Sequence, residues 1–312
     1  MPITLPPISR RRFLGSSLAG AAAAALLPQW LQAADAAIDP HRFVLLSDIH
    51  IDADRTFAKS ETNVWNTLQQ AVGEILATTT ATRPAAVLVN GDLAHHQGNP
   101  EDYATVLDGL KPLRTGGLTL HLAMGNHDHR ANFWKAMPAD EARQPGVADR
   151  QICVVEAPRA NVVMLDSLDK TAAAPGVLGA AQLAWLGKTL DARKDKPAIV
   201  FVHHDPDPRT PEQKKDPKSK GGSLTDTQAF FDVILPRKQV KALVFGHTHD
   251  WHHLERDGMQ MVNLPPTAWL FKQGRPRGWV DLNLTETGAT FELRSLDPKH
   301  PQHGEKLDLK WR

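Results

Sequence analysis

Side chains that bind divalent metals recur in this sequence directly after short apolar runs. Five runs end in candidate ligands. The five groups, in chain order, are Asp48/His50, Asp92, Asn126/His127/Asp128, His203/His204 and His247/His249. Carboxylate, amide and imidazole groups suit divalent ions such as Mn, Fe, Zn or Co. A single group of this kind is usually no metal site, but eleven of the fifteen histidines lie within or beside these five groups. The clustering therefore predicts one shared metal site.

Spacing within the groups supports the same prediction. Asp48 and His50 are two residues apart, as are His247 and His249, and residues two apart in an extended segment share a face. We therefore expect both members of each pair to face one site. A glycine precedes three of the groups: Gly91, Gly125 and Gly246. Glycine permits the tight turns that bring backbone and ligands close to a metal.

The apolar runs are typical of buried strands, and the amphipathic segments between them are typical of helices. The expected strands span residues 43–47, 85–90, 118–124, 162–165, 198–202 and 240–245, and the expected helices span residues 63–78, 103–110, 180–192 and 225–235. Short alternating segments at 259–264, 278–284 and 289–296 indicate antiparallel strands. Together they predict one α/β domain built on mixed sheets. Because the carboxyl ends of neighbouring strands share a crevice, the five ligand groups should meet there.

The first 36 residues have the order of a secretory signal peptide. Arginines at 10–12 precede an apolar run at 14–27, and small residues follow that run. The run is shorter than the roughly 20 residues of a membrane-spanning helix, so we expect cleavage between residues 32 and 38 and no stable membrane anchor afterwards. Paired arginines directly before Phe-Leu resemble a twin-arginine signal, which predicts the twin-arginine export machinery as a partner and a periplasmic or otherwise exported protein. An ordinary secretory signal or an Ala-rich amphipathic tail remains an alternative.

Composition and charge narrow the function classes. With 41% hydrophobic and 23% charged residues, the chain has the balance of a globular protein. Residues 1–36 hold three arginines and one aspartate, which leaves 33 basic and 34 acidic residues in the remainder. Such a neutral body offers no basic surface for DNA or anionic lipid, so we expect no nucleic-acid partner. The single cysteine, Cys153, excludes an internal disulfide and a thiolate metal cage. Residues 205–222, rich in Pro, Lys and Asp, predict either a solvated loop or a lid that contacts the substrate.

The ordered set Asp-x-His, Gly-Asp, Gly-Asn-His-Asp, His-His and Gly-His-x-His resembles the calcineurin-like metallophosphoesterase family over roughly residues 43–253. The resemblance implies an α/β four-layer sandwich of two mixed β-sheets flanked by helices, with a dinuclear metal site at the C-terminal ends of the strands. It places the phosphoesterase domain at residues 37–312, after a signal peptide at 1–36.

Carried over by motif, the resemblance implies two ligand sets that share one carboxylate. The first metal would take Asp48, His50, His249 and Asp92, and the second would take Asp92, Asn126, His203 and His247. A carboxylate has two oxygens to share between cations, which suits Asp92 to the bridge. His203 is favoured over His204 because the family's ligand directly follows the strand, but His204 remains a rival.

The family pattern also implies the reaction. Two metals would activate a bridging hydroxide that attacks phosphorus directly, without a covalent enzyme intermediate. His127 would protonate the leaving group and Asp128 would position it. Purple acid phosphatases carry a metal-binding tyrosine where this chain has His95, and a nuclease branch has a transition-state histidine there. We therefore expect His95 and His96 to contact the substrate phosphate, with a hydrogen bond to a metal ligand or a place in a solvated loop as an equal alternative. We expect His204 to contact the substrate as well.

The motif His203-His204-Asp205-Pro206 resembles the cyclic-nucleotide and glycerophosphodiester phosphodiesterase branch. The sequence thus predicts a metal-dependent phosphodiesterase that acts on small-molecule phosphodiesters. An exported phosphomonoesterase is the nearest alternative. A nuclease is a weaker one because the chain lacks net basic charge, and so is a non-catalytic metal-binding envelope protein, because no motif residue is missing.

Overall fold

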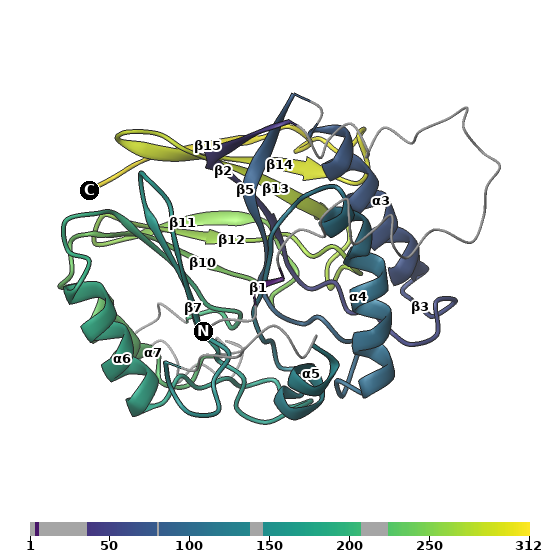
Figure 1. The fold of residues 1–312 in the computed structure, drawn as a ribbon, viewed down its shortest axis with the longest axis horizontal. Coiled ribbons are helices and arrows are strands. Elements are labelled where there is room, and N and C mark those ends of the chain that lie inside the picture. Colours follow the sequence, from purple (N-terminus) through teal and green to yellow (C-terminus); the bar gives the residue numbers. More distant parts are fainter. Residues whose placement is uncertain (1–3, 6–35, 80, 138–145, 207–223) are drawn as a thin grey trace.

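The computed structural model describes residues 4–5, 36–79, 81–137, 146–206 and 224–312. Two mixed β-sheets pack face to face, and helices cover their outer faces (Figure 1). The predicted four-layer α/β sandwich is therefore confirmed. Most of the segment 205–222, for which the sequence predicts either a lid or a solvated loop, lies outside the described residues, and so does nearly all of the predicted signal peptide.

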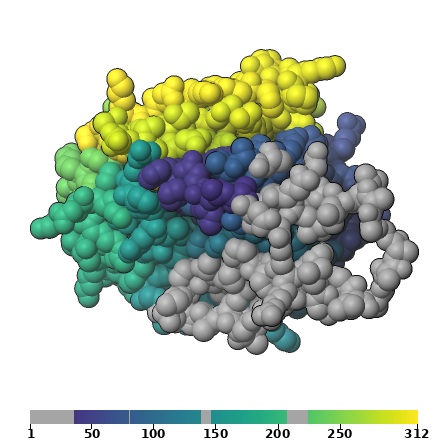
Figure 2. Space-filling view, turned by 45° about the horizontal axis from the view of Figure 1, so that its top comes forward, coloured from purple at the N-terminus to yellow at the C-terminus, as the bar shows by residue number. Residues whose placement is uncertain are grey.

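The first sheet has the order β1-β6-β5-β2-β13-β14-β15. Its strands are β1 (Thr4–Leu5), β6 (Leu120–Leu122), β5 (Thr82–Val89), β2 (Ala37–Leu46), β13 (Gly278–Leu284), β14 (Gly288–Ser295) and β15 (Lys306–Lys310). Strands β2, β5 and β6 run parallel, and β13, β14 and β15 extend the sheet beyond β2, each antiparallel to the strand before it. Figure 2 shows these C-terminal strands, in yellow, lying along the purple N-terminal part of the described chain.

The second sheet has the order β11-β12-β10-β9-β8-β7. Its strands are β11 (His252–Arg256), β12 (Met259–Asn263), β10 (Val240–Phe245), β9 (Ala198–Phe201), β8 (Asn161–Met164) and β7 (Cys153–Glu156). The four central strands are parallel and the two edge strands are antiparallel. The prediction that the 259–264 segment belongs to an antiparallel end is wrong in part, because β12 pairs in parallel with β10.

Helices α3 (Val64–Ala77), α4 (Pro100–Thr115) and α5 (Arg130–Ala136) cover the first sheet, and α6 (Ala180–Asp191) and α7 (Thr227–Ile234) cover the second (Figure 1). Alternation along the strands builds the layers. In β2, Val44 and Leu46 pack toward α3 and α4, whereas Phe43 and Leu45 pack between the sheets. None of the described helices is both long and apolar enough to cross a membrane.

Several elements differ from the sequence prediction in extent. Helix α4 begins earlier than expected because Asn99 and Asp102 form a capping box around Pro100 at its start. The short elements α5, β7, β11 and β15 were not predicted, since each is brief and most are partly exposed. A hairpin of β3 (Ala58–Lys59) and β4 (Thr62–Asn63) also lies ahead of α3.

A buried ion pair ties the centre of the first sheet together. Arg42 of β2 donates from Nε and Nη2 to the two carboxylate oxygens of Asp281 on β13, each at 2.8 Å. The same guanidinium donates to the Thr78 hydroxyl and carbonyl oxygens at the end of α3. Two parallel bonds fix the geometry of such a pair and hold the helix end on the sheet.

Candidate metal centre

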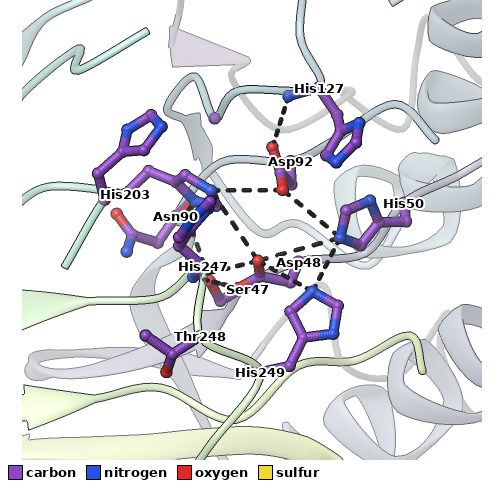
Figure 3. Close-up of polar contacts among 12 residues, drawn as sticks. Ser47, Asp48, His50, Asn90, Asp92, His127, His203, His247, Thr248 and His249 are labelled. Carbon is purple, nitrogen blue, oxygen red and sulfur yellow. Dashed lines mark hydrogen bonds and ion pairs between the residues drawn. The ribbon is translucent and has the colours of Figure 1, made fainter. Parts of the chain in front are cut away.

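The predicted ligands meet where five parallel strands of the two sheets end (Figure 3). Asp48 and His50 follow β2, Asp92 follows β5 and Asn126 follows β6. His203 follows β9, and both His247 and His249 follow β10. All seven residues are buried except His247, which is partly buried. The convergence expected from the strand ends is therefore present.

Asp92 lies between two histidine groups. Its Oδ2 atom is 3.5 Å from His50 Nε2 and 3.3 Å from His203 Nε2, and these histidines come from different sheets. Ligand atoms of Asp92, His203 and His247 lie within 4.8 Å of one another, and so do those of Asp92, His50 and His127. Asp92 is thus placed to share its carboxylate between two cations.

Asp48 completes the group on the other side of the centre. Its Oδ1 atom lies 3.4 Å from His249 Nε2 and 4.0 Å from His50 Nε2. The two imidazole nitrogens are themselves only 3.0 Å apart (Figure 3). Ligand atoms of this carboxylate and these two histidines converge within 4.8 Å, which is the arrangement of a metal site.

Unpartnered buried atoms show that the residues fit cations. Among the described residues, Asn126 Oδ1 and His203 Nε2 are buried without a hydrogen-bond partner. Buried polar atoms are almost always satisfied, so these two atoms need a partner that the described residues do not supply. Nitrogen and oxygen donors of this kind suit several divalent metals.

The electrostatics of the site also call for positive charge. Burial alone lowers the pKa of His203, but the carboxylates of Asp92 and Asp48 raise it to about 10. Against the opposing effect of burial, His203 and His50 hold the pKa of Asp92 well below its usual range. The buried carboxylates of Asp92 and Asp48 therefore favour positive charge at this place, which bound cations would supply.

The backbone at the strand ends is left-handed rather than extended. Asp48, His50, Asp92, His247 and His249 have φ values of 53°, 46°, 49°, 66° and 50°. The expectation that Asp-x-His and His-x-His pairs share a face of an extended segment is therefore wrong. The side chains converge because each strand ends in a turn with positive φ, a conformation that is uncommon for residues other than glycine.

Glycines make room for these turns, as the sequence predicted. A Cβ atom on Gly125 would overlap the backbone and carboxylate of Asp92. One on Gly246 would overlap the Ser47 hydroxyl and the Asp48 carboxylate, and Gly91, at φ 86°, faces the His203 ring. Each glycine thus lets one strand end approach a ligand carried by another.

Backbone carbonyls orient the histidine rings. His249 Nδ1 donates to the Trp269 carbonyl at 2.6 Å, and His203 Nδ1 donates to the Asn90 carbonyl at 2.8 Å. A ring fixed through Nδ1–H presents the Nε2 lone pair to a metal. His127 follows the same rule, since its Nδ1 lies 3.0 Å from the His96 carbonyl and its backbone N–H donates to Asp92 (Figure 3).

Asp128 does not hold the His127 ring, which corrects the sequence expectation. Its carboxylate instead accepts hydrogen bonds from the backbone N–H groups of Leu93, Ala94 and Gly125 and from the Tyr103 hydroxyl. Burial raises the pKa of Asp128 to about 7, against the lowering effect of those N–H groups. Asp128 therefore ties together the loops that carry Asp92 and Asn126.

Comparison with known proteins agrees with this geometry. The sequence pattern of the calcineurin-like phosphoesterases matches residues 41–251, which include all seven predicted ligands. The chain belongs to this family. It is therefore a phosphoester hydrolase.

Relatives with named activities share about a quarter of their residues with this phosphoesterase. The chain is 26% identical over 231 residues to the 3′,5′-cyclic adenosine monophosphate phosphodiesterase CpdA of Pseudomonas aeruginosa, covering 74% of this chain and 78% of that protein. It is 26% identical over 248 residues to a probable cyclic nucleotide phosphodiesterase of Ruthia magnifica, covering 80% and 95%.

Solved structures show the same fold at lower identity. A dimetal phosphatase from Danio rerio superposes with a TM-score of 0.65 at 16% identity, covering 88% of this chain and all of that one. A purple acid phosphatase from yellow lupin superposes with a TM-score of 0.56 at 14% identity, covering 86% of this chain and 53% of that one.

The predicted substrate-binding histidines lie in different environments. His95 is partly buried, pairs with Asp52 at 3.0 Å and packs on Phe57. His96 is exposed, with its ring centroid 5.8 Å from that of His127, so both remain candidates for substrate contact. His204 has 0% exposure, which contradicts a direct substrate contact.

Of the adjacent residues His203 and His204, His204 is also the less suitable candidate for a metal ligand. Its Nδ1 lies 2.6 Å from the Ser167 hydroxyl, and it belongs to none of the convergent groups that include Asp92. Ser167 was not predicted from the sequence, and neither were Ser47, which donates to Asp48, and the Trp269 carbonyl. Of these, only Ser47 had a sequence signal, because it directly precedes a ligand.

Proposed function

We propose that this phosphoesterase is a metal-dependent phosphodiesterase that acts on small-molecule phosphodiesters. The observation that carries the proposal is the position of Asp92, whose carboxylate faces His50 on one side and His203 on the other. The relatives named as cyclic-nucleotide phosphodiesterases support a diester substrate.

Each half of the centre would hold one divalent ion. Asp48, His50 and His249 would hold the first, Asn126, His203 and His247 the second, and Asp92 both. Bound divalent ions neutralise phosphate charge and lower the pKa of water, which lets water act as a nucleophile at neutral pH. The ligand set accepts Mn, Fe, Zn or Co.

His127 is placed to donate a proton to the leaving group. Its Nδ1 is occupied by the His96 carbonyl, which leaves Nε2 for the substrate, and its ring centroid lies 5.1 Å from that of His50. His127→Ala should keep both metals and lose about 10²–10⁴-fold in turnover on esters with poor leaving groups. An equal loss on p-nitrophenyl esters, whose leaving group needs no proton, would contradict the acid role.

The test of the function is a pair of initial rates, on bis-p-nitrophenyl phosphate and p-nitrophenyl phosphate, with the full chain reconstituted with Mn²⁺. A strong diester preference that Asp92→Ala abolishes supports the proposal. A monoester preference would make the protein a phosphatase on the same centre. Metal binding without turnover of either ester would favour a non-catalytic metal-binding protein.

We also propose that the protein is exported through the twin-arginine machinery to the periplasm or beyond the cell. The support is the order of residues 10–36, in which paired arginines precede the apolar run. Replacing Arg11 and Arg12 by lysine should retain the protein inside cells that export the unchanged chain. Export that survives this replacement would indicate an ordinary secretory signal instead.

A further inference from the structure

One wall of the metal centre carries an exposed aromatic ring. Phe271 is 64% exposed, more than Ile38 or Leu254, the other exposed large hydrophobic side chains among the described residues. Its ring lies parallel to that of the metal-ligand candidate His249, with centroids 3.9 Å apart and an interplanar angle of 8°. The apolar surface therefore stands directly beside the reacting centre rather than on a remote face.

A cation lies on the same wall. The Lys59 ammonium is 4.0 Å from the centroid of the Trp269 ring, and that ring is 4.2 Å from His50 and 5.5 Å from His249. Lys59 belongs to the β3–β4 hairpin and is exposed, whereas Trp269 is buried. The hairpin and the loop between β12 and β13 thus bring a lysine and a phenylalanine to one half of the centre.

We propose that Phe271 and Lys59 form a subsite for a planar, nucleobase-like group of an anionic phosphodiester. This inference rests on the proposed phosphodiesterase function and narrows its substrate class. A flat ring stacks on an exposed benzene ring whichever base it is, because every base has a π-face. The ammonium group attracts the phosphate that such a base carries toward the metals.

The same groups disfavour the other small phosphodiesters of the branch. A glycerol group has no planar surface to stack on Phe271. A choline group binds aromatic faces through its positive charge and could approach the exposed Phe271 ring, but the Lys59 ammonium on the neighbouring Trp269 repels a second cation. The wall therefore selects a nucleotide diester over a glycerophosphodiester.

Binding separates this subsite from the chemistry of the metals. Calorimetry on the full chain loaded with Mn²⁺ would give dissociation constants for 5′-AMP and for inorganic phosphate, which share the anion but not the base. Phe271→Ala should raise the ratio of the AMP constant to the phosphate constant about tenfold, the size expected for one stacked base. Phe271→Tyr should restore the ratio, and Leu254→Ala, at an exposed position on β11, should leave it unchanged.

Kinetics supply the second readout. Phe271→Ala should raise KM for 3′,5′-cyclic AMP relative to KM for glycerophosphocholine, and Lys59→Met should shift the same ratio in the same direction while Lys59→Arg does not. The proposal is overturned if Phe271→Ala changes both dissociation constants equally, or neither, or if glycerophosphocholine is the better substrate of the unchanged enzyme. If the unchanged enzyme hydrolyses no diester but the AMP ratio still shifts, the proposed function fails and the subsite stands.

Discussion

Replacement of Asp128 tests whether this residue holds together the two loops that carry Asp92 and Asn126 or orients the His127 ring. Its carboxylate accepts three backbone N–H groups and one hydroxyl, and its side chain is fully buried. Asp128→Ala leaves all four donors without their acceptor. A buried donor without a partner costs about 1–3 kcal/mol, so the three N–H groups alone should cost at least about 3 kcal/mol of the free energy of unfolding.

Asp128→Asn is the sharper variant because it keeps the shape of the side chain. The amide oxygen can accept from Leu93 and Gly125, but the amide nitrogen that replaces the other oxygen accepts nothing, so the Ala94 N–H and the Tyr103 O–H lose their acceptor. At about 1–3 kcal/mol for each buried donor, the expected cost is at least about 2 kcal/mol. Tyr103→Phe should cost about 1–3 kcal/mol, because it removes the acceptor of the His129 N–H at 2.7 Å.

Urea unfolding at pH 8 with a chelator would measure these costs without the contribution of metals, and calorimetric titration with Mn²⁺ would measure metal affinity separately. Both Asp128 variants should lower metal affinity, because the loops that they loosen carry Asp92 and Asn126. The reasoning is refuted if Asp128→Asn keeps full stability and metal affinity yet loses turnover only on esters with poor leaving groups. That pattern would return Asp128 to the role of orienting His127.

Three further predictions test the close approaches and the buried groups. Gly125→Ala should lose metal and about 1–3 kcal/mol of stability through overlap with the Asp92 carboxylate. Gly73→Ala, in a helix with open space around it, should be neutral or stabilising by up to about 1 kcal/mol, and thermal melting and metal content would measure both variants. Asp281→Asn breaks its buried pair with the β2 arginine and should cost about 3–5 kcal/mol in urea unfolding. Asp108→Asn removes an exposed pair and should cost less than about 1 kcal/mol. Burial raises the pKa of the Cys153 thiol to about 12, so a thiol reagent at pH 8 should label it only after unfolding, and rapid labelling of the native protein would contradict its placement.

The strands and the convergence of the candidate ligands could be predicted from the sequence because both depend on local pattern. A buried strand is a short apolar run, and a polar residue just after it lies at the carboxyl end of the sheet. The positions of Asp48, Asp92 and His203 after their strands therefore predicted that these residues meet, whereas the choice of His203 over His204 as a ligand came from the family resemblance and stays a prediction. The strand β12 was misplaced because alternation shows that a segment is a strand but not which neighbour it pairs with.

The supporting contacts could not be predicted for a different reason. The Trp269 carbonyl that orients His249 lies twenty residues along the chain from it, and a backbone carbonyl has no signature in sequence. The role of Asp128 was misjudged because adjacency to His127 in the motif suggested contact, whereas the fold turns its carboxylate toward backbone amides of two loops. Spacing along the chain indicates local neighbours, whereas the partners across the crevice are decided by the packing of the sheets.

The backbone of the ligands links the stability of the fold to its function. Five of the ten described non-glycine residues with positive φ are predicted metal ligands, and each such conformation costs on the order of 1 kcal/mol or more. Their sum is a substantial share of the net stability of a domain, about 5–15 kcal/mol, so the surroundings must offset it. The glycines, the Asp128 hydrogen bonds and the carbonyls that fix the histidine rings provide that support from the protein side. A bound cation would add to it, because it would satisfy buried atoms at these turns, such as His203 Nε2 and Asn126 Oδ1, that no group of the described chain satisfies.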